Sequence, residues 1–153
     1  MDEAELAVWR AFLHAHTVVI QRIEEDLKAH GLPPLGWYDV LWPLYRAENG
    51  RLRMNELAEE VVLSRTGLVR LVDRVEAAGL LRREPVPEDG RGSYAVITED
   101  GVATLQQIWP IYRRHIQQDF LDPLGPDARR LRTAFERITE KRRAATPEPQ
   151  ASS

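Results

Sequence analysis

The chain has 153 residues, a length that suits one domain or two closely joined subdomains. Hydrophobic residues make up 43% and charged residues 29%, which is typical of a globular protein and not of a disordered or collagen-like chain. There is no cysteine, which excludes disulfides, thiolate metal sites and thiol nucleophiles. No apolar run approaches the ~18 residues of a membrane helix, and the acidic start is the reverse of a signal peptide, so we expect a cytoplasmic protein.

Basic charge is concentrated near the middle of the chain. The net charge of −3 by itself gives no hint of a nucleic-acid partner. Residues 64–83, however, contain five arginines against two acidic residues. This stretch is therefore the first place to look for contacts with an anionic partner.

The first segment is predicted to be one long helix. Gly31, with Pro33 and Pro34 just beyond it, is a typical helix end. The apolar residues before it form two seven-residue series, as along a seam between packed helices. They are Leu6, Leu13, Ile20 and Leu27 in one series and Trp9, His16, Ile23 and His30 in the other. A second helix is expected over residues 35–48, with a bend at Pro43.

Residues 54–98 contain a predicted pair of helices followed by a hairpin. Residues 54–61 form a short helix, and a tight connection leads to a helix over residues 64–78 that Ser64 caps. Residues 80–86 and 93–98 flank a polar, glycine-containing loop at 87–92, which indicates a β-hairpin. A short helix, a tight turn, a second helix and a hairpin make up a winged helix-turn-helix.

The helix over residues 64–78 has two distinct faces. Projection at 100° per residue separates an apolar side from a polar side that carries the arginines. The apolar side holds Leu68, Leu71, Val72, Val75 and Gly79. On the polar side, Asp73 and Glu76 are expected to pair with neighbouring arginines and to hold the face in shape.

The polar face suits the major groove of DNA. Arg65 and Arg70 are long enough for bidentate contact with guanine, and Thr66 and Val69 can touch a thymine methyl group. Arg74 lies farther along, where a phosphate is the expected partner. The competing interpretation is an ordinary solvated helix face.

Two further features are suited to the DNA backbone and the minor groove. Ser64 and the free N–H groups at the start of the same helix offer a phosphate site. Arg91 stands between two glycines at the hairpin tip, where a guanidinium group can enter the narrow minor groove. The simpler interpretation of Arg91 is an exposed turn residue.

Residues 99–143 are predicted to form two more helices. Thr98 caps a helix over residues 99–121 with a bend at Pro110, and a last helix covers residues 127–143. The first and last helices carry more apolar surface than a chain of this size buries, so we expect a homodimer. The fold class is mainly α with a small β-hairpin wing. We assign residues 1–34 and 99–143 to dimerisation, 35–98 to DNA binding and 144–153 to a disordered tail.

Several motifs resemble the MarR (multiple antibiotic resistance regulator) family of transcription factors. They are Asn55-Glu-Leu-Ala58, Leu63-Ser-Arg-Thr66, Arg70-Leu-Val-Asp-Arg-Val-Glu76, Gly79-Leu-Leu81 with Arg83, and Asp89-Gly-Arg91 followed by Ile97-Thr-Glu-Asp-Gly101. The resemblance covers about residues 51–101. It implies a dimer formed by the first and last helices, binding to palindromic operator DNA, and release of the DNA by a small, often aromatic or phenolic, ligand.

The resemblance and the polar helix face together give the candidate DNA-binding residues. These are Ser64, Arg65, Thr66, Gly67, Val69, Arg70, Arg74, Asp89 and Arg91. The resemblance gives Asp89 the task of orienting Arg91 or the wing. Gly67 and Val69 stand where the family often has hydroxyl or small polar residues, so we expect a different base preference.

A small-molecule site is expected beside the second helix and the helix over residues 99–121. Aromatic residues there would line a cleft between the dimerisation and DNA-binding regions. The candidates are His16, Trp37, Tyr38, Leu41, Trp109 and Tyr112. The competing interpretation is that they belong to the core, or that His16 is an interface histidine. The four histidines lack metal-ligand spacing, so neither a metal nor a cofactor is expected.

The sequence thus predicts a DNA-binding transcriptional regulator, a repressor that leaves its operator when a ligand binds. An enzyme is not expected, because no nucleophile elbow, phosphate loop or metal triad is visible. The alternative is a winged-helix module that binds proteins and not DNA. Enrichment of a palindrome from random-sequence DNA separates the two.

Overall fold

The computed structural model describes residues 1–62 and 66–145, with side chains to residue 140. The chain forms two compact units, Met1–His115 and Ile116–Ser153. None of the described helices is both long enough and apolar enough to cross a membrane.

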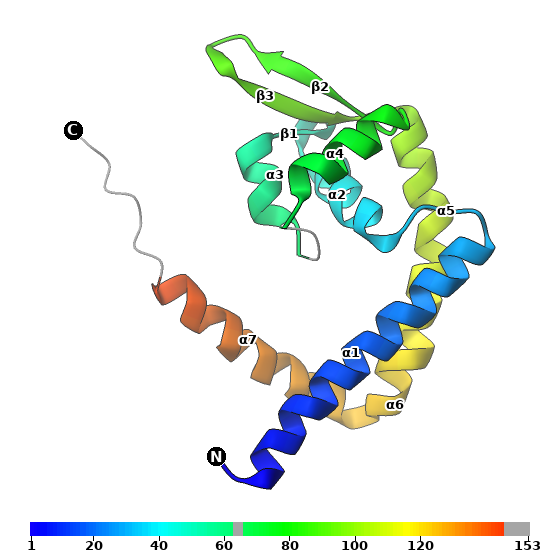
Figure 1. The fold of residues 1–153 in the computed structure, drawn as a ribbon, viewed down its shortest axis with the longest axis vertical. Coiled ribbons are helices and arrows are strands. Elements are labelled where there is room, and N and C mark those ends of the chain that lie inside the picture. Colours follow the sequence, from blue (N-terminus) through cyan, green and yellow to red (C-terminus); the bar gives the residue numbers. More distant parts are fainter. Residues whose placement is uncertain (63–65, 146–153) are drawn as a thin grey trace. The chain divides into compact units, whose positions relative to one another are not determined.

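The first unit contains five α-helices and a small sheet (Figure 1). In chain order they are α1 (Glu3–Ala29), α2 (Leu35–Arg46), the 3₁₀ turn η1 (Glu48–Gly50), β1 (Arg51–Arg53), α3 (Met54–Glu60), α4 (Leu68–Ala77), β2 (Leu81–Val86), β3 (Asp89–Ile97) and α5 (Glu99–His115). The predicted fold class, mainly helical with a small β-hairpin wing, is confirmed.

The strands form an antiparallel sheet in the order β1-β3-β2. Leu52 of β1 lies opposite Ala95 of β3, and Leu81 of β2 lies opposite Ile97. The hairpin of β2 and β3 extends beyond the helices as the wing (Figure 1). Because β1 adds a third strand, the base of the wing is fixed to the body of the unit.

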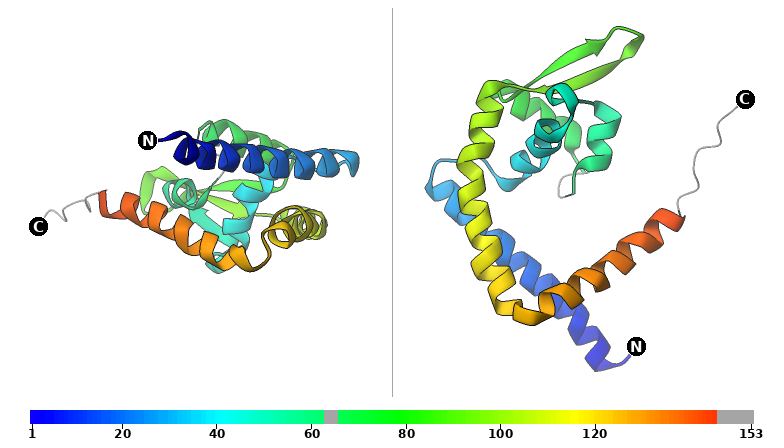
Figure 2. Two further views of the ribbon diagram at one scale, coloured as in Figure 1. Left: turned by 90° about the horizontal axis from the view of Figure 1, so that it is seen from below. Right: turned by 180° about the vertical axis from the view of Figure 1, so that it is seen from behind.

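Every helix of this unit contributes side chains to one core. Fully buried members include Ile23 and Leu27 of α1, Leu41 and Leu44 of α2, Leu57 of α3, Val72 and Val75 of α4 and Ile108 of α5. The C-terminal half of α1 lies beside α5, as the rear view shows (Figure 2). The N-terminal half of α1 instead leaves its apolar side chains exposed in the single chain.

A carboxylate joins the ends of α1 and α5. Asp26 accepts hydrogen bonds from Arg114 and from His115 Nε2, the latter at 2.8 Å, and His30 Nδ1 lies 3.1 Å from its other oxygen. Hydrogen bonding by His115, then by Arg114, outweighs the opposing effect of burial and lowers the pKa of Asp26. This network fixes α1 against the last turn of α5.

The second unit consists of short segments and one long helix. They are the π-helix η2 (Ile116–Leu121), α6 (Asp122–Leu124), the 3₁₀ turn η3 (Gly125–Asp127) and α7 (Ala128–Ala145). The predicted last helix over residues 127–143 is confirmed within two residues at its C-terminal end. Of the predicted disordered tail, residues 144–145 belong to α7 and residues 146–153 lie outside the described part of the chain.

Three predicted boundaries are wrong. The helix predicted over residues 64–78, α4, begins at Leu68, because Gly67 before it adopts a left-handed conformation with φ +75° that an α-helix cannot continue through. The loop of the wing is shorter, because β3 begins at Asp89 and a register shift after Pro85 pairs Val86 with Asp89. The helix from Glu99 ends its α-helical part at His115 and continues as a π-helix, with its wider turns.

Candidate nucleic-acid interface

Helix α4 presents a polar face to solvent because its apolar residues recur at helical spacing. Leu68, Leu71, Val72 and Val75 point into the core, as predicted. On the opposite side Val69 is 64% exposed, and Arg70 and Arg74 are also exposed. Within residues 1–62 and 66–140, neither of these arginines forms an ion pair. Two free guanidinium groups therefore lie along one exposed helix face.

The approach to α4 differs from the prediction. Thr66 and Gly67 lie in a turn before the helix and are exposed, and the first helical N–H groups are those of the residues from Leu68 onward. Ser64 and Arg65, predicted to cap the helix and to read bases, lie outside the described residues. Gly67 is needed here for its positive φ, which any L side chain adopts only with strain.

Arg83 of β2 forms ion pairs with two carboxylates of α4. Its Nη2 donates to Asp73 Oδ1 at 2.7 Å and its Nη1 to Glu76 Oε1 at 2.8 Å, while its backbone N–H donates to Glu76 Oε2 at 2.6 Å. Partial burial would lower the pKa of Arg83, but the bonds to Asp73 and Glu76 outweigh it and raise that pKa. These bonds hold α4 and the wing in a fixed position relative to each other.

The sequence predicted that Asp73 and Glu76 pair with neighbouring arginines. Their described partner is Arg83, which lies on strand β2 and not on α4. Because Asp73 and Glu76 pair with Arg83, their charge is compensated there, and Arg70 and Arg74 keep their charge for an external partner. The signal in the sequence was the spacing of ten and seven residues to Arg83, which no rule for a single helix captures.

The junction between α4, the wing and α5 is built by Gly79, Thr98 and Gly101. Thr98 Oγ1 donates to the Gly79 carbonyl at 2.6 Å and accepts from the Gly101 N–H at 3.1 Å, so the predicted cap of α5 is confirmed. A Cβ on Gly101 would lie 2.1 Å from the Leu80 carbonyl oxygen. Only glycine, which has no Cβ, lets the start of α5 lie so close to the backbone that follows α4.

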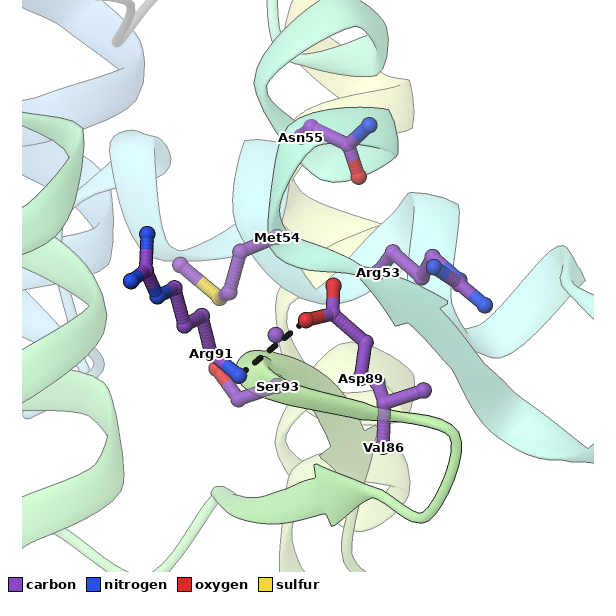
Figure 3. A pocket seen from close by; sticks show the side chains of 8 residues that line it. Arg53, Met54, Asn55, Val86, Asp89, Arg91 and Ser93 are labelled. Carbon is purple, nitrogen blue, oxygen red and sulfur yellow. Dashed lines mark hydrogen bonds between the residues drawn. The ribbon is translucent and has the colours of Figure 1, made fainter.

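The wing carries Arg91 on a turn that Asp89 shapes. Asp89 Oδ1 accepts the backbone N–H of Arg91 at 3.1 Å, and the Arg91 side chain points away from this carboxylate (Figure 3). Asp89 thus fixes the backbone of the wing and does not pair with the guanidinium group. A Cβ on Gly92 would lie 2.9 Å from Asp89 Oδ2, so this glycine makes room for the turn.

A cavity of about 270 Å³ separates the wing from the start of α3 (Figure 3). Its lining consists of Arg53, Met54 and Asn55 on one side and Val86, Asp89, Arg91, Gly92 and Ser93 on the other. Both Arg53 and Arg91 contribute positive charge here, and Asp89 contributes the negative charge. The cavity therefore has charged, polar and apolar side chains in its lining.

An aromatic cluster lies between α2 and α5. Tyr38 stacks on Trp42 and on Trp109, with ring centroids 5.9 and 6.3 Å apart, and meets the edge of Tyr112 at 5.3 Å. Trp42 also stacks on Tyr45 at 5.8 Å. Trp42, Tyr45 and Trp109 are 40%, 50% and 44% exposed, so one side of the cluster faces solvent.

The predicted ligand residues divide into three groups. Tyr38, Trp109 and Tyr112 meet in the aromatic cluster, whereas Leu41 is completely buried in the core and Trp37 packs against that core. His16 is exposed on α1 and contacts the ring of Phe12. Tyr45 was missing from the sequence-based candidates, although its spacing of seven residues from Tyr38 places it on the same helix face.

Burial keeps the two phenols of the cluster protonated. It raises the pKa of Tyr38 to about 12, with a smaller contribution from Tyr112. It also raises the pKa of Tyr112, with a smaller contribution from the negative charge of Asp39. Both hydroxyl groups are therefore available as hydrogen-bond donors at neutral pH. In the described ranges, no group of three or more His, Asp or Glu side chains is arranged to hold a metal ion.

Comparison with known proteins identifies the family. A family model described as MarR family matches residues 30–92. The HTH-type transcriptional regulator YkoM of Bacillus subtilis is 30% identical over 125 residues, which cover 82% of this chain and 79% of YkoM. The chain belongs to the MarR family. It is a transcriptional regulator and not an enzyme, as the sequence predicted.

Two solved structures of the MarR family have closely similar folds. AbsC from Streptomyces coelicolor is 32% identical, with a TM-score of 0.84 over 94% of this chain and 97% of AbsC. Sco3205 from the same organism, solved in complex with DNA, is 29% identical, with a TM-score of 0.84 over 99% of this chain and 95% of Sco3205. The fold of this MarR regulator is thus shared with AbsC and Sco3205 along nearly the whole chain.

Proposed function

We propose that this MarR regulator is a homodimeric repressor that binds a palindromic operator and leaves it when a small aromatic ligand binds. The observation that carries the proposal is the set of exposed arginines on one rigid unit. Arg70 and Arg74 project from α4, Arg91 projects from the wing, and Arg83 holds these two elements together. Repression follows because a bound dimer and RNA polymerase cannot occupy the same promoter DNA.

The expected roles of the arginines follow from their positions. Arg70 lies early in α4, next to the exposed Val69, where it contacts a guanine edge while Val69 contacts a thymine methyl group. Arg74 lies one turn later and contacts a phosphate. Arg91 enters the adjacent minor groove. Sco3205, which has a similar fold and was solved in complex with DNA, supports DNA binding by this fold.

The exposed half of α1 supports a dimer. Val8, Trp9, Phe12 and Leu13 are 72%, 56%, 41% and 44% exposed and lie on one face of the helix. The rings of Trp9 and Phe12 lie 5.7 Å apart, so this face is a continuous apolar strip. Such a strip is costly in water, and a second copy of the chain covers it by symmetry.

The aromatic cluster supports an aromatic ligand. Trp42 and Trp109 are partly exposed aromatic rings that a ligand can contact, and the protonated hydroxyl groups of Tyr38 and Tyr112 are donors for a phenolate or carboxylate oxygen. A ligand wedged between α2 and α5 changes the distance between the two recognition helices. These helices must lie about 34 Å apart to enter successive major grooves.

The experiment is selection of bound sequences from a random DNA library. A dimeric regulator enriches a palindrome whose half-sites lie about one helical turn apart. A protein-interaction module enriches no sequence. The ligand proposal is tested separately by thermal-shift screening with aromatic acids and phenols, because a ligand that binds the folded state raises its melting temperature. If none of these compounds shifts the melting temperature, the aromatic class is wrong.

A further inference from the structure

Asp39 connects α2 to Val62, which lies between α3 and α4 in the chain. Both of its carboxylate oxygens accept the backbone N–H of Val62, at distances of 3.2 and 3.1 Å. Val62 is the second residue beyond the end of α3 and precedes the turn into α4 by only a few residues. Its side chain is 82% exposed, so this residue has little apolar packing to hold it.

Asp39 is also adjacent to the aromatic cluster. It follows Tyr38 directly in α2, and its charge contributes to the raised pKa of Tyr112 on α5. Pro43 lies four residues later and has no N–H to donate to the Asp39 carbonyl, so α2 lacks one backbone hydrogen bond at this turn. A helix is more easily displaced at such a point.

We propose that Asp39 is a positioning residue for DNA reading, which holds Val62 against α2 and passes displacements of the aromatic cluster to α4. This inference rests on the proposed function. The rim of the cluster can move without disturbing the core, because Trp42 and Trp109 are partly exposed. A shift of α2 then changes the position of Val62 through a short, directional contact.

The contact can be removed from either side. Asp39→Ala removes the acceptor, whereas Val62→Pro removes the donor and leaves the carboxylate in place. Proline fits after Val61, whose φ of −70° and ψ of 135° are favourable before proline. Asp39→Asn keeps one oxygen acceptor. Glu24→Ala is the matched control. Glu24 Oε1 accepts the Leu35 N–H at 2.9 Å, so this substitution removes an equivalent hydrogen bond elsewhere on α2.

The first measurement needs no DNA. Amide hydrogen exchange of a peptide covering residues 62–70 should accelerate about tenfold in Asp39→Ala and should not change in Glu24→Ala. Equal exchange in wild type and Asp39→Ala would show that the carboxylate does not hold this segment. That result overturns the inference whether or not the protein binds DNA.

The second measurement is affinity for the selected operator at fixed salt. Asp39→Ala and Val62→Pro should each raise Kd about five- to tenfold, and the double variant should be no worse than either. Asp39→Asn and Glu24→Ala should stay within about twofold of wild type. Accelerated exchange with unchanged Kd would overturn the positioning role. Absence of operator binding by the wild type would instead refute the proposed function, and the positioning role with it.

The last arm tests the connection to the aromatic cluster. In the wild-type background, Trp109→Ala should raise or lower the Kd for the operator about two- to threefold. In the Asp39→Ala background the same substitution should have no effect, because the contact that carries the displacement is gone. An identical fold-change in both backgrounds would show that the cluster and the recognition helix communicate by another route.

Discussion

Replacing the guanidinium group of Arg83 should loosen the recognition helix from the wing. Arg83→Met keeps the length of the side chain and the backbone bond to Glu76, but loses the two charged bonds of 2.7 and 2.8 Å. The Arg83 side chain is 28% exposed, and those of Asp73 and Glu76 are 56% and 34% exposed. The loss therefore lies between that of an exposed pair and that of a buried charged bond, at about 1–2.5 kcal/mol.

Thermal unfolding and operator binding should both report this loss. Each 1 kcal/mol lowers the Tm of a chain of this size by roughly 2–5 °C. Operator affinity should fall further than stability alone explains, because Arg70 and Arg91 no longer approach DNA on one body. Arg82→Met is the control, since Arg82 is on the same strand, is 56% exposed and pairs only with Glu84 among the described residues. If Arg83→Met and Arg82→Met lower Tm and operator affinity equally, Arg83 does not hold α4 and the wing together.

Three further outcomes are expected. Arg91→Ala should weaken binding to operators with A·T-rich flanks more than to operators with G·C-rich flanks in a titration at fixed salt; equal weakening would argue against a minor-groove contact. Gly101→Ala should destabilise the fold by about 2 kcal/mol or more, because its Cβ would meet the Leu80 carbonyl oxygen at 2.1 Å, and a wild-type Tm would contradict this. The pKa of Asp26 is lowered, chiefly by hydrogen bonding to His115, so its contribution to stability is present above its unfolded value of 3.8 and is lost as pH falls through the folded value. Asp26→Asn should accordingly lower Tm at neutral pH and make no difference in strong acid; a constant Tm difference at every pH would refute that interpretation.

Periodicity was sufficient to predict the helices and the buried side of α4. Leu68, Leu71, Val72 and Val75 recur at helical spacing, and burying them leaves only one face for the arginines. The hairpin was visible because a polar, glycine-containing loop separates two runs of strand formers. These features are local, so the chain specifies them within a few neighbouring residues.

The features that the sequence did not predict depend on contacts between distant residues or on backbone conformation. The pairing of Arg83 with Asp73 joins a strand to a helix ten residues earlier. The left-handed conformation of Gly67 delays the start of α4, although the side-chain pattern of a helix extends before it. The bond between Asp39 and Val62 spans 23 residues and has no signature in either segment. Such contacts follow from the packed arrangement and not from a local rule.

We propose above all that Arg70 reads a base from the exposed face of α4. The most direct measurement is competition between the selected operator and all single-base variants of one half-site, with wild type and Arg70→Ala. We expect Arg70→Ala to lose ~1–3 kcal/mol of affinity and to discriminate no longer at one base position, while the other positions remain discriminated. Uniform weakening at every position, or unchanged discrimination, would contradict it.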